Sequence, residues 1–248
     1  MTRQQDKQLQ QTLAALRDRW GRGIVQRLGD HAGDAPLTIP TGYAKLDHLL
    51  GGGAPQGRIS LFSGQATSGI TTLAWHVLAH VPSGPLIYLD ARQTFDPVLA
   101  AGYGVPLSRL LLAYPTDLLH GLRLAQDIVL AHGDLIPLLL LDIPQEWLAP
   151  PAIAAPLATT LARLIAPLSR GNCVLLILAT SADETPPPNN PLAQFAALYL
   201  QAKRQRWRYR RRDVAAYDTD IEVIKNKLKP GPARLSLTII PEREMLPP

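Results

Sequence analysis

The sequence predicts an α/β protein in which a mainly parallel sheet is flanked by helices. Apolar runs with the length of a buried strand recur at residues 59–62, 86–89, 138–141 and 174–179. Longer amphipathic stretches separate them, and this alternation is typical of a parallel sheet covered on both faces. The last third alternates apolar and polar residues instead, which predicts antiparallel C-terminal strands. A chain of 248 residues is long enough to bury the core of one such domain.

Composition and charge limit the classes of function. The net charge is +5, with much of the positive charge in residues 203–212, so nucleic acid is a natural partner to consider. The single cysteine, Cys173, lies in an apolar run, which predicts a buried, inert thiol and no disulfide within the chain. The chain starts with polar residues and lacks an apolar run of the ~18 residues that a membrane span needs. We therefore expect a cytoplasmic protein without a membrane partner.

The first 36 residues are predicted to form a helix and an oligomerisation segment ahead of a core domain at residues 37–248. Residues 3–20 have a helical pattern, two glycines follow, and residues 24–28 have the composition of a short strand. The narrow apolar stripe of the helix consists of Leu9, Leu13, Leu16 and Trp20. We expect a helix with so narrow a stripe to pack on its own domain or to dock on a neighbour.

A short loop after the first predicted core strand has the pattern of a phosphate-binding loop. Gly64, Gly69 and Thr71 stand at the spacing G-x-x-x-x-G-K-[ST], ahead of a helix predicted at 71–80. In such loops the backbone N–H groups at the helix start hold the phosphates, and the lysine neutralises the phosphate oxygens. Ile70 occupies the lysine position here. The pattern thus predicts the backbone cradle without its fixed positive charge.

The middle of the chain continues the alternation, and two of its strands end in an acid. The predicted elements are a strand at 85–90, a helix at 97–102, a strand at 110–113, a helix at 117–131, a strand at 138–142, a helix at 152–169 and a strand at 174–179. Asp117 is a suitable N-cap for its helix. Asp142 is either a Mg²⁺ ligand or an acid that caps a loop, whereas Asp90 is expected to be structural.

The last third combines predicted antiparallel strands with a dense basic run. Strands are predicted at 198–212, 221–227 and 235–240, with a turn at 213–220. The seven basic residues of the run are Lys203, Arg204, Arg206, Arg208, Arg210, Arg211 and Arg212. On a strand, the arginines at 206, 208 and 210 would share one face, and Trp207 and Tyr209 the other. This density favours a strip that contacts nucleic-acid phosphates, and the alternative is a charged hairpin that keeps the protein soluble.

Many short matches in the same order resemble the bacterial RecA recombinase family. They lie at residues 6–8, 21–29, 39–42, 46–47, 50–51, 55–59, 90–91, 96–97, 142 and 223–227, besides the loop at 64–72. The resemblance implies a RecA-like P-loop NTPase core with an N-terminal helix that docks on an adjacent subunit. It also implies that Asp142 is the Walker B aspartate and that Lys225 and Lys227 reach a neighbour's nucleotide. The alternative for these two lysines is solvated charge on an edge strand.

The departures from this family concern residues that its members use for ATP hydrolysis. Ile70 replaces the lysine, Arg92 stands in place of the glutamate that activates water, and Thr180 replaces the glutamine that senses the γ-phosphate. The DNA-binding loops are reduced to the segment from Ser181 to Leu192, and we expect no C-terminal domain. Phosphoryl transfer needs positive charge on the phosphate oxygens and a group that orients water. The sequence therefore predicts lost ATPase activity and no catalytic residue.

These observations together predict an ATPase-deficient RecA-like accessory protein in DNA recombination or repair. Its expected partners are single-stranded or duplex DNA, together with further copies of the chain, a RecA-type recombinase or a repair polymerase. A vestigial or weak nucleotide site would comprise Gly64, Ser68, Gly69, Ile70, Thr71, Thr72, Asp142, Lys225 and Lys227. ATP and Mg²⁺ could bind there without hydrolysis, with Thr71 and Asp142 as metal ligands. The two alternatives are an active DNA-dependent ATPase in which Arg92 replaces the lysine, and a scaffold that binds neither nucleotide nor DNA.

Overall fold

The computed structural model describes residues 3–20, 37–181, 191–210, 213–229, 231 and 233–240. The chain forms two compact units, residues 1–36 and residues 37–248. In the first unit, α1 (Arg3–Trp20) is the helix that the sequence predicts. The predicted strand at 24–28 lies outside the described residues. Within the described parts of the chain, no helix has the length and apolar character needed to cross a membrane.

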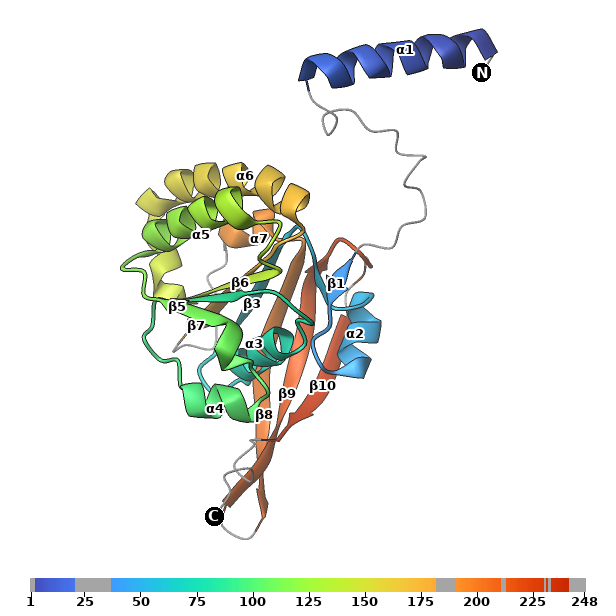
Figure 1. Cartoon of the computed structure of the whole chain (residues 1–248). Helices are drawn as coiled ribbons and strands as arrows, with labels where there is room; N and C mark the ends of the chain where they lie inside the picture. The colour runs from blue at the N-terminus through green and yellow to red at the C-terminus, as the bar shows by residue number, and fades with distance from the viewer. Residues whose placement is uncertain are drawn as a thin grey trace. The chain divides into compact units, whose positions relative to one another are not determined.

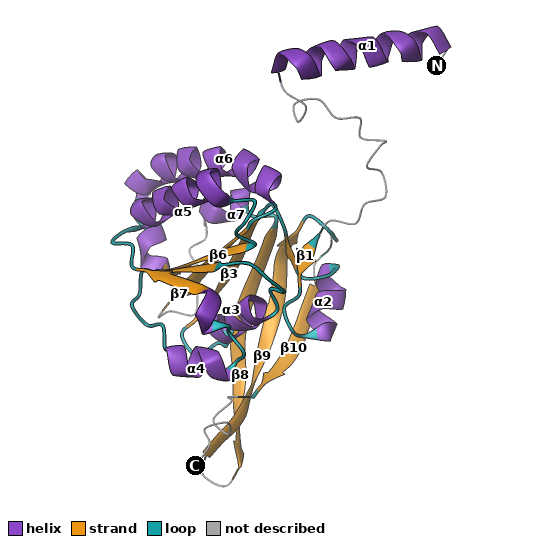
Figure 2. Ribbon diagram, viewed as in Figure 1, coloured by secondary structure: helices purple, strands orange, loops and turns teal. Residues whose placement is uncertain are grey.

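An eight-stranded sheet forms the centre of the second unit, in the order β10-β9-β8-β3-β7-β6-β4-β5 (Figure 1, Figure 2). Its strands are β3 (Ile59–Gln65), β4 (Leu86–Asp90), β5 (Leu110–Ala113), β6 (Leu138–Pro144), β7 (Val174–Ser181), β8 (Leu198–Arg210), β9 (Asp213–Asn226) and β10 (Ala233–Ile239). Strands β3 to β8 pair in parallel, whereas β9 is antiparallel to β8 and to β10. A separate small sheet pairs β1 (Thr38–Ile39) with β2 (Ala54–Pro55). The predicted fold class is confirmed.

Helices cover both faces of the central sheet. They are α2 (Ala44–Leu50), α3 (Ile70–Ala79), α4 (Pro97–Gly102), α5 (Leu118–His132), α6 (Ala154–Gly171) and α7 (Pro191–Phe195), with 3-10 turns at Leu107–Arg109, Gln145–Leu148 and Pro151–Ile153. Buried residues of α2 and α3 share one core with Phe62 and Leu140 of the sheet. Those of α5 and α6 share a second core with Leu61 and Leu141. Neighbouring strand residues thus enter opposite cores, as strands buried on both faces require.

Two local predictions are confirmed by contacts within the domain. The Asp117 carboxylate accepts a hydrogen bond of 2.8 Å from the N–H of His120, so it caps α5. Cys173 is fully buried, and burial raises the pKa of its thiol to about 12, which keeps the thiol protonated and inert.

The turn predicted at residues 213–220 is wrong, because these residues form the first half of β9. They pair with β8 in one long hairpin. Asp218 and Asp220 belong to a residue type that is rare in strands, but here arginines on the adjacent strands pair with both carboxylates. The distal part of the hairpin extends past α4 (Figure 1).

Candidate nucleotide site and candidate nucleic-acid interface

The loop between β3 and α3 has the two glycines of a phosphate-binding loop at positions where no larger residue fits. Gly69 has a φ angle of 85°, and a Cβ added there would lie 2.5 Å from Ile239 Cδ1 and 2.8 Å from Tyr217 Cε2. A Cβ added to Gly64 would lie 2.5 Å from Ser68 Oγ. Glycine is therefore required at both positions by the close packing of the loop.

Ile70, in the lysine position, is part of the hydrophobic core. Its side chain is 1% exposed and packs in the core on the α3 face of the sheet. Thr71, the predicted metal ligand, is half-buried, and Thr72 is buried with its hydroxyl 3.3 Å from the Tyr217 hydroxyl. Residues 64–72 contain no lysine or arginine, so any positive charge near this loop comes from elsewhere in the chain.

Asp142 at the end of β6 is a buried acid with two partners. The Tyr88 hydroxyl donates a hydrogen bond of 2.9 Å to its Oδ2, and Arg92 Nη1 lies 3.7 Å from its Oδ1. Burial raises the pKa of this carboxyl to about 6, although Arg92 and the hydrogen bond from Tyr88 act in the opposite direction. Arg92 therefore places its charge against the Asp142 carboxylate.

Asp90 and Thr180 lie close to Asp142 in the sheet register. Asp90 pairs with Asp142 across β4 and β6, and its carboxylate accepts hydrogen bonds from the N–H groups of Arg92 and Phe95. Thr180 lies on β7 between Gly64 and Pro144, and its buried hydroxyl has no hydrogen-bond partner among the described residues. Asp90 thus holds the turn that positions Arg92.

Lys225 is engaged within its own domain. Its ammonium donates hydrogen bonds to the carbonyl oxygens of Ala193 at 2.8 Å and Gln194 at 3.1 Å, at the end of α7. Burial, followed by the charge of Lys227, lowers the pKa of Lys225. Lys225 pairs with Tyr199 of β8 but lies past Val223, where the pairing of β9 with β10 ends, and Lys227 follows the end of β9.

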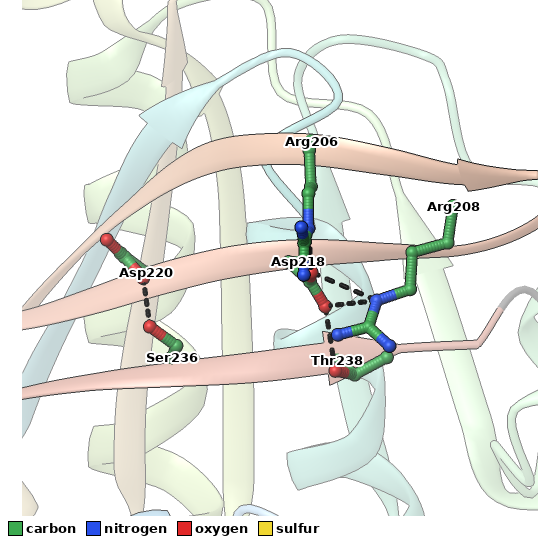
Figure 3. A network of polar contacts seen from close by, with 6 residues as sticks. All are labelled: Arg206, Arg208, Asp218, Asp220, Ser236 and Thr238. Carbon is green, nitrogen blue, oxygen red and sulfur yellow. Dashed lines mark hydrogen bonds and ion pairs between the residues drawn. The ribbon is translucent and has the colours of Figure 1, made fainter.

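The basic run lies on β8, and two of its arginines contact one aspartate on β9 (Figure 3). Arg206 Nε lies 2.7 Å from Asp218 Oδ2, and Arg208 Nε lies 2.8 Å from Asp218 Oδ1. The hydroxyl of Thr238 on β10 donates to the same carboxylate at 2.8 Å. Hydrogen bonds from Arg208 and Arg206 hold the pKa of Asp218 well below its usual range. The side chains of residues 210–212 lie outside what the structure describes.

Asp220 forms a second group on the same face of the hairpin. Its carboxylate accepts hydrogen bonds from Gln205 Nε2 at 2.8 Å, from Arg234 and from the Ser236 hydroxyl. Sequence reasoning missed Asp218 and Asp220 as partners of the basic run. The signal was present, because two acids two residues apart on one strand face a neighbouring strand of alternating arginines.

The other face of the hairpin contacts the loop between β3 and α3. Arg204 donates a hydrogen bond to the Thr67 hydroxyl, and its guanidinium lies 4.7 Å from the centre of the Trp207 ring. Trp207 packs edge-on against Tyr217, with ring centres 5.4 Å apart. The Thr219 hydroxyl donates to the Ser68 carbonyl at 2.7 Å. An irregularity in the pairing between 204 and 206 allows Arg204 to face the loop while Arg206 faces Asp218.

Comparisons with known proteins show the family to which the chain belongs. The model of the RecA N-terminal domain matches residues 7–145, which is more than half of the chain. The chain belongs to the RecA family. A Protein RecA of Brucella anthropi is 30% identical over 249 residues, covering 90% of this chain and 68% of that protein. A Protein RecA of Staphylococcus carnosus is 26% identical over 254 residues, covering 93% and 71%.

A solved structure supports the fold independently. The crystal structure of the RadB recombinase superposes with a TM-score of 0.65 at 19% identity, covering 80% of this chain and 94% of that one. At this identity the likeness bears on the fold alone.

Proposed function

We propose that this RecA-family protein is an ATPase-deficient accessory protein of DNA recombination or repair in the cytoplasm. The observation that carries the proposal is the contact of Arg92 with Asp142, combined with the burial of Ile70. Phosphoryl transfer needs a cation on the transferring phosphate and an acid or amide that orients water. In this chain Ile70, at the lysine position, is buried in the core, and Arg92, at the glutamate position, is paired with the Asp142 carboxylate.

The residues fit a catalytic Mg²⁺ poorly. The Arg92 guanidinium lies 3.7 Å from Asp142 Oδ1 and would compete with a metal ion for this carboxylate. This contact supports a protein that does not depend on ATP turnover.

DNA binding is proposed to use the basic strip, which we define as Lys203, Arg206 and Arg208 on β8. The side chains of Arg206 and Arg208 are 70% and 49% exposed, and both contact Asp218 through Nε. A guanidinium has five N–H donors, so the contact with Asp218 orients each arginine and leaves donors for a phosphate. This favours a preorganised strip that tracks a nucleic-acid backbone.

A DNA titration tests the strip. Wild-type protein and the Arg206→Gln/Arg208→Gln variant are titrated with a labelled single strand at low and raised salt, by fluorescence anisotropy. We expect about a tenfold weaker affinity for the variant at low salt and a salt slope smaller by about 1.4, since each lost phosphate contact removes about 0.7. The control is Arg123→Gln/Arg163→Gln, which removes two exposed charges from α5 and α6. Equal affinities for wild type and strip variant would refute the strip.

A second feature supports assembly through the N-terminal segment. Strand β5 is an edge of the sheet, and beside it an apolar groove of about 420 Å³ is lined by residues that include Leu111, Leu124, Ile128 and Leu135. Leu111 is 61% exposed and Leu135 63%. We propose that the apolar stripe of α1 from a second copy occupies this groove. Leu9 and Leu16 of this stripe are half-buried, and their apolar side chains could cover the exposed leucines of the groove.

Sedimentation of two variants tests this assembly. Leu16→Glu damages the helix stripe and Leu111→Glu damages the groove, so each variant alone should be monomeric. A mixture of the two should associate in pairs, because one partner keeps an intact helix and the other an intact groove. Val98→Glu, an exposed residue on α4, is the control and should sediment like wild type. A mixture that stays monomeric while wild type assembles would contradict this interface.

A further inference from the structure

A polar cavity of about 330 Å³ opens where the parallel strands β3, β6 and β7 end and the polar face of β8, β9 and β10 begins. It is lined by Gly64, Gln65, Gln145, Ser181, Gln201, Ala202, Lys203, Asp220, Glu222 and Arg234. The register brings these residues together, because Gln65 pairs with Ser181, and Gln201 with Glu222. Ligands of open α/β sheets commonly bind in the crevice outside the carboxyl ends of the strands.

Five functional groups of this cavity have no side-chain partner within the part of the chain that the structure describes. The amides of Gln65, Gln145 and Gln201, the Lys203 ammonium and the Glu222 carboxylate make no side-chain hydrogen bond or ion pair with any residue that the structure describes. Gln145 is only 6% exposed. Buried polar groups normally have partners, so a nearly buried amide that faces a polar cavity is available to pair with a group from outside the protein. By contrast, Asp220 and Arg234 in the same cavity satisfy each other.

The chemistry of these groups favours a nucleobase over an anion. Each glutamine amide offers a donor and an acceptor side by side, which is the pattern that pairs with the edge of a base. The Glu222 carboxylate accepts from an exocyclic amino group and repels phosphate, whereas the charge of Asp220 is paired with Arg234. Lys203 belongs both to the cavity and to the basic strip, so it lies where a base in the cavity would join a backbone on the strip. A volume near the lower end for ligand pockets suits a single small ring system.

We propose that the cavity receives one unpaired base of a single DNA strand whose phosphates follow the basic strip. The proposal rests on the proposed DNA binding and adds a pocket that contacts a base. A base inside a duplex would have to leave its stack before it could enter, and this disfavours duplex DNA. The amides from β3, β8 and the turn after β6 would then read the base edge, while Arg206 and Arg208 hold the backbone.

Strands with and without bases test the proposal. Wild-type protein is titrated with a short single strand and with a strand of equal length that carries abasic residues, so that the phosphates are the same. We expect wild type to bind the base-bearing strand about tenfold more tightly, a ratio typical of one well-made base contact. Gln145→Leu/Gln201→Leu should bring this ratio close to one. Gln126→Leu on α5, outside the cavity, is the control and should keep the wild-type ratio.

The outcomes separate this inference from the proposed strip. Equal affinity of wild type for the two strands would overturn the base pocket, and the salt dependence would still report on the strip.

If neither strand binds, the proposed DNA function fails, and deoxynucleoside monophosphates then test the cavity alone through the side-chain amide NMR signals of Gln145 and Gln201. Unshifted signals at saturating concentrations would also overturn the pocket. Should the double variant fail to fold, Gln145→Glu tests the same position. Its carboxylate only accepts hydrogen bonds, so this variant should bind strands whose bases carry amino groups more tightly than strands of thymine.

Discussion

The candidate nucleotide site and the basic hairpin both contain arginine–aspartate pairs, but the two pairs differ in burial. Asp142 is 1% exposed, and the side chain of Arg92 is 25% exposed. Arg206 and Arg208 contact Asp218 while their side chains stay 70% and 49% exposed. An enclosed pair directs its charges at each other, whereas an exposed guanidinium can still reach a phosphate. The two groups differ in how accessible their arginines are, and this accessibility, more than the number of charges, favours the hairpin as the surface that binds DNA.

Ile70→Lys is expected to have the largest effect, because it restores the missing charge at a core position. Burying a lysine lowers its pKa by up to several units, and we expect destabilisation by about 4 kcal/mol in urea unfolding. Ile70→Met keeps the volume and the apolar character, so it should cost less than about 1.5 kcal/mol. A lysine variant that is as stable as wild type and binds ATP would show that position 70 opens onto a phosphate site. This result would contradict the enclosed position described here.

Asp142→Asn should stabilise the protein at neutral pH and not at acid pH. The pKa of Asp142 in the folded protein is about 6, above its ordinary value of 3.8, so its ionisation opposes folding as the pH rises from about 4 to 6. The gain in unfolding free energy should approach about 3 kcal/mol at pH 7 and vanish below about pH 4. Thermal melts across this range measure it, with the exposed Asp127→Asn on α5 as the control. A gain that does not change with pH would refute the buried-carboxylate account.

Gly69→Ala tests whether β9 and β10 pack directly on the loop between β3 and α3. The variant combines an unfavourable φ of 85° with a Cβ 2.5 Å from Ile239 Cδ1, and we expect a loss of about 2 kcal/mol. Gly104 has a similar φ of 83° but its nearest neighbour, Ala79 Cβ, would be 3.6 Å away. Gly104→Ala should therefore cost only about 1 kcal/mol. Equal losses at the two positions would mean that the backbone angle alone matters.

Tyr217→Phe has the smallest expected effect, since it removes only the hydroxyl that lies 3.3 Å from the Thr72 hydroxyl. A single hydrogen bond of this kind contributes about 1 kcal/mol to unfolding free energy. Tyr209→Phe is the matched control, because Tyr209 is 63% exposed and should tolerate the change. An unchanged stability of the first variant would show that this contact does not couple the hairpin to the loop.

The fold could be predicted well because its signals are local. Apolar runs of strand length such as 138–141 read as strands buried on both faces, and the glycine spacing from Gly64 to Gly69 located the turn between β3 and α3. The acid at Asp117 marked the start of a helix. The register of one strand against another follows from pairing across the sheet, which no local pattern encodes.

The candidate sites depended on contacts between residues far apart in sequence, and these were harder to predict. The contact of Arg92 with Asp142 joins the ends of β4 and β6, and the turn predicted at 213–220 failed because the arginines that neutralise Asp218 lie on the preceding strand. The cavity around Gln145 gave no sequence signal, since its amides come from three separate elements.

The most direct test of the central claim is ATP turnover measured with purified protein, Mg²⁺ and saturating single-stranded DNA. We expect phosphate release at the rate of a blank without protein, and a DNA affinity that ATP does not change. The contrary result is DNA-stimulated turnover that Asp142→Ala abolishes, because such turnover would need the site in which Ile70 is buried and Arg92 faces Asp142.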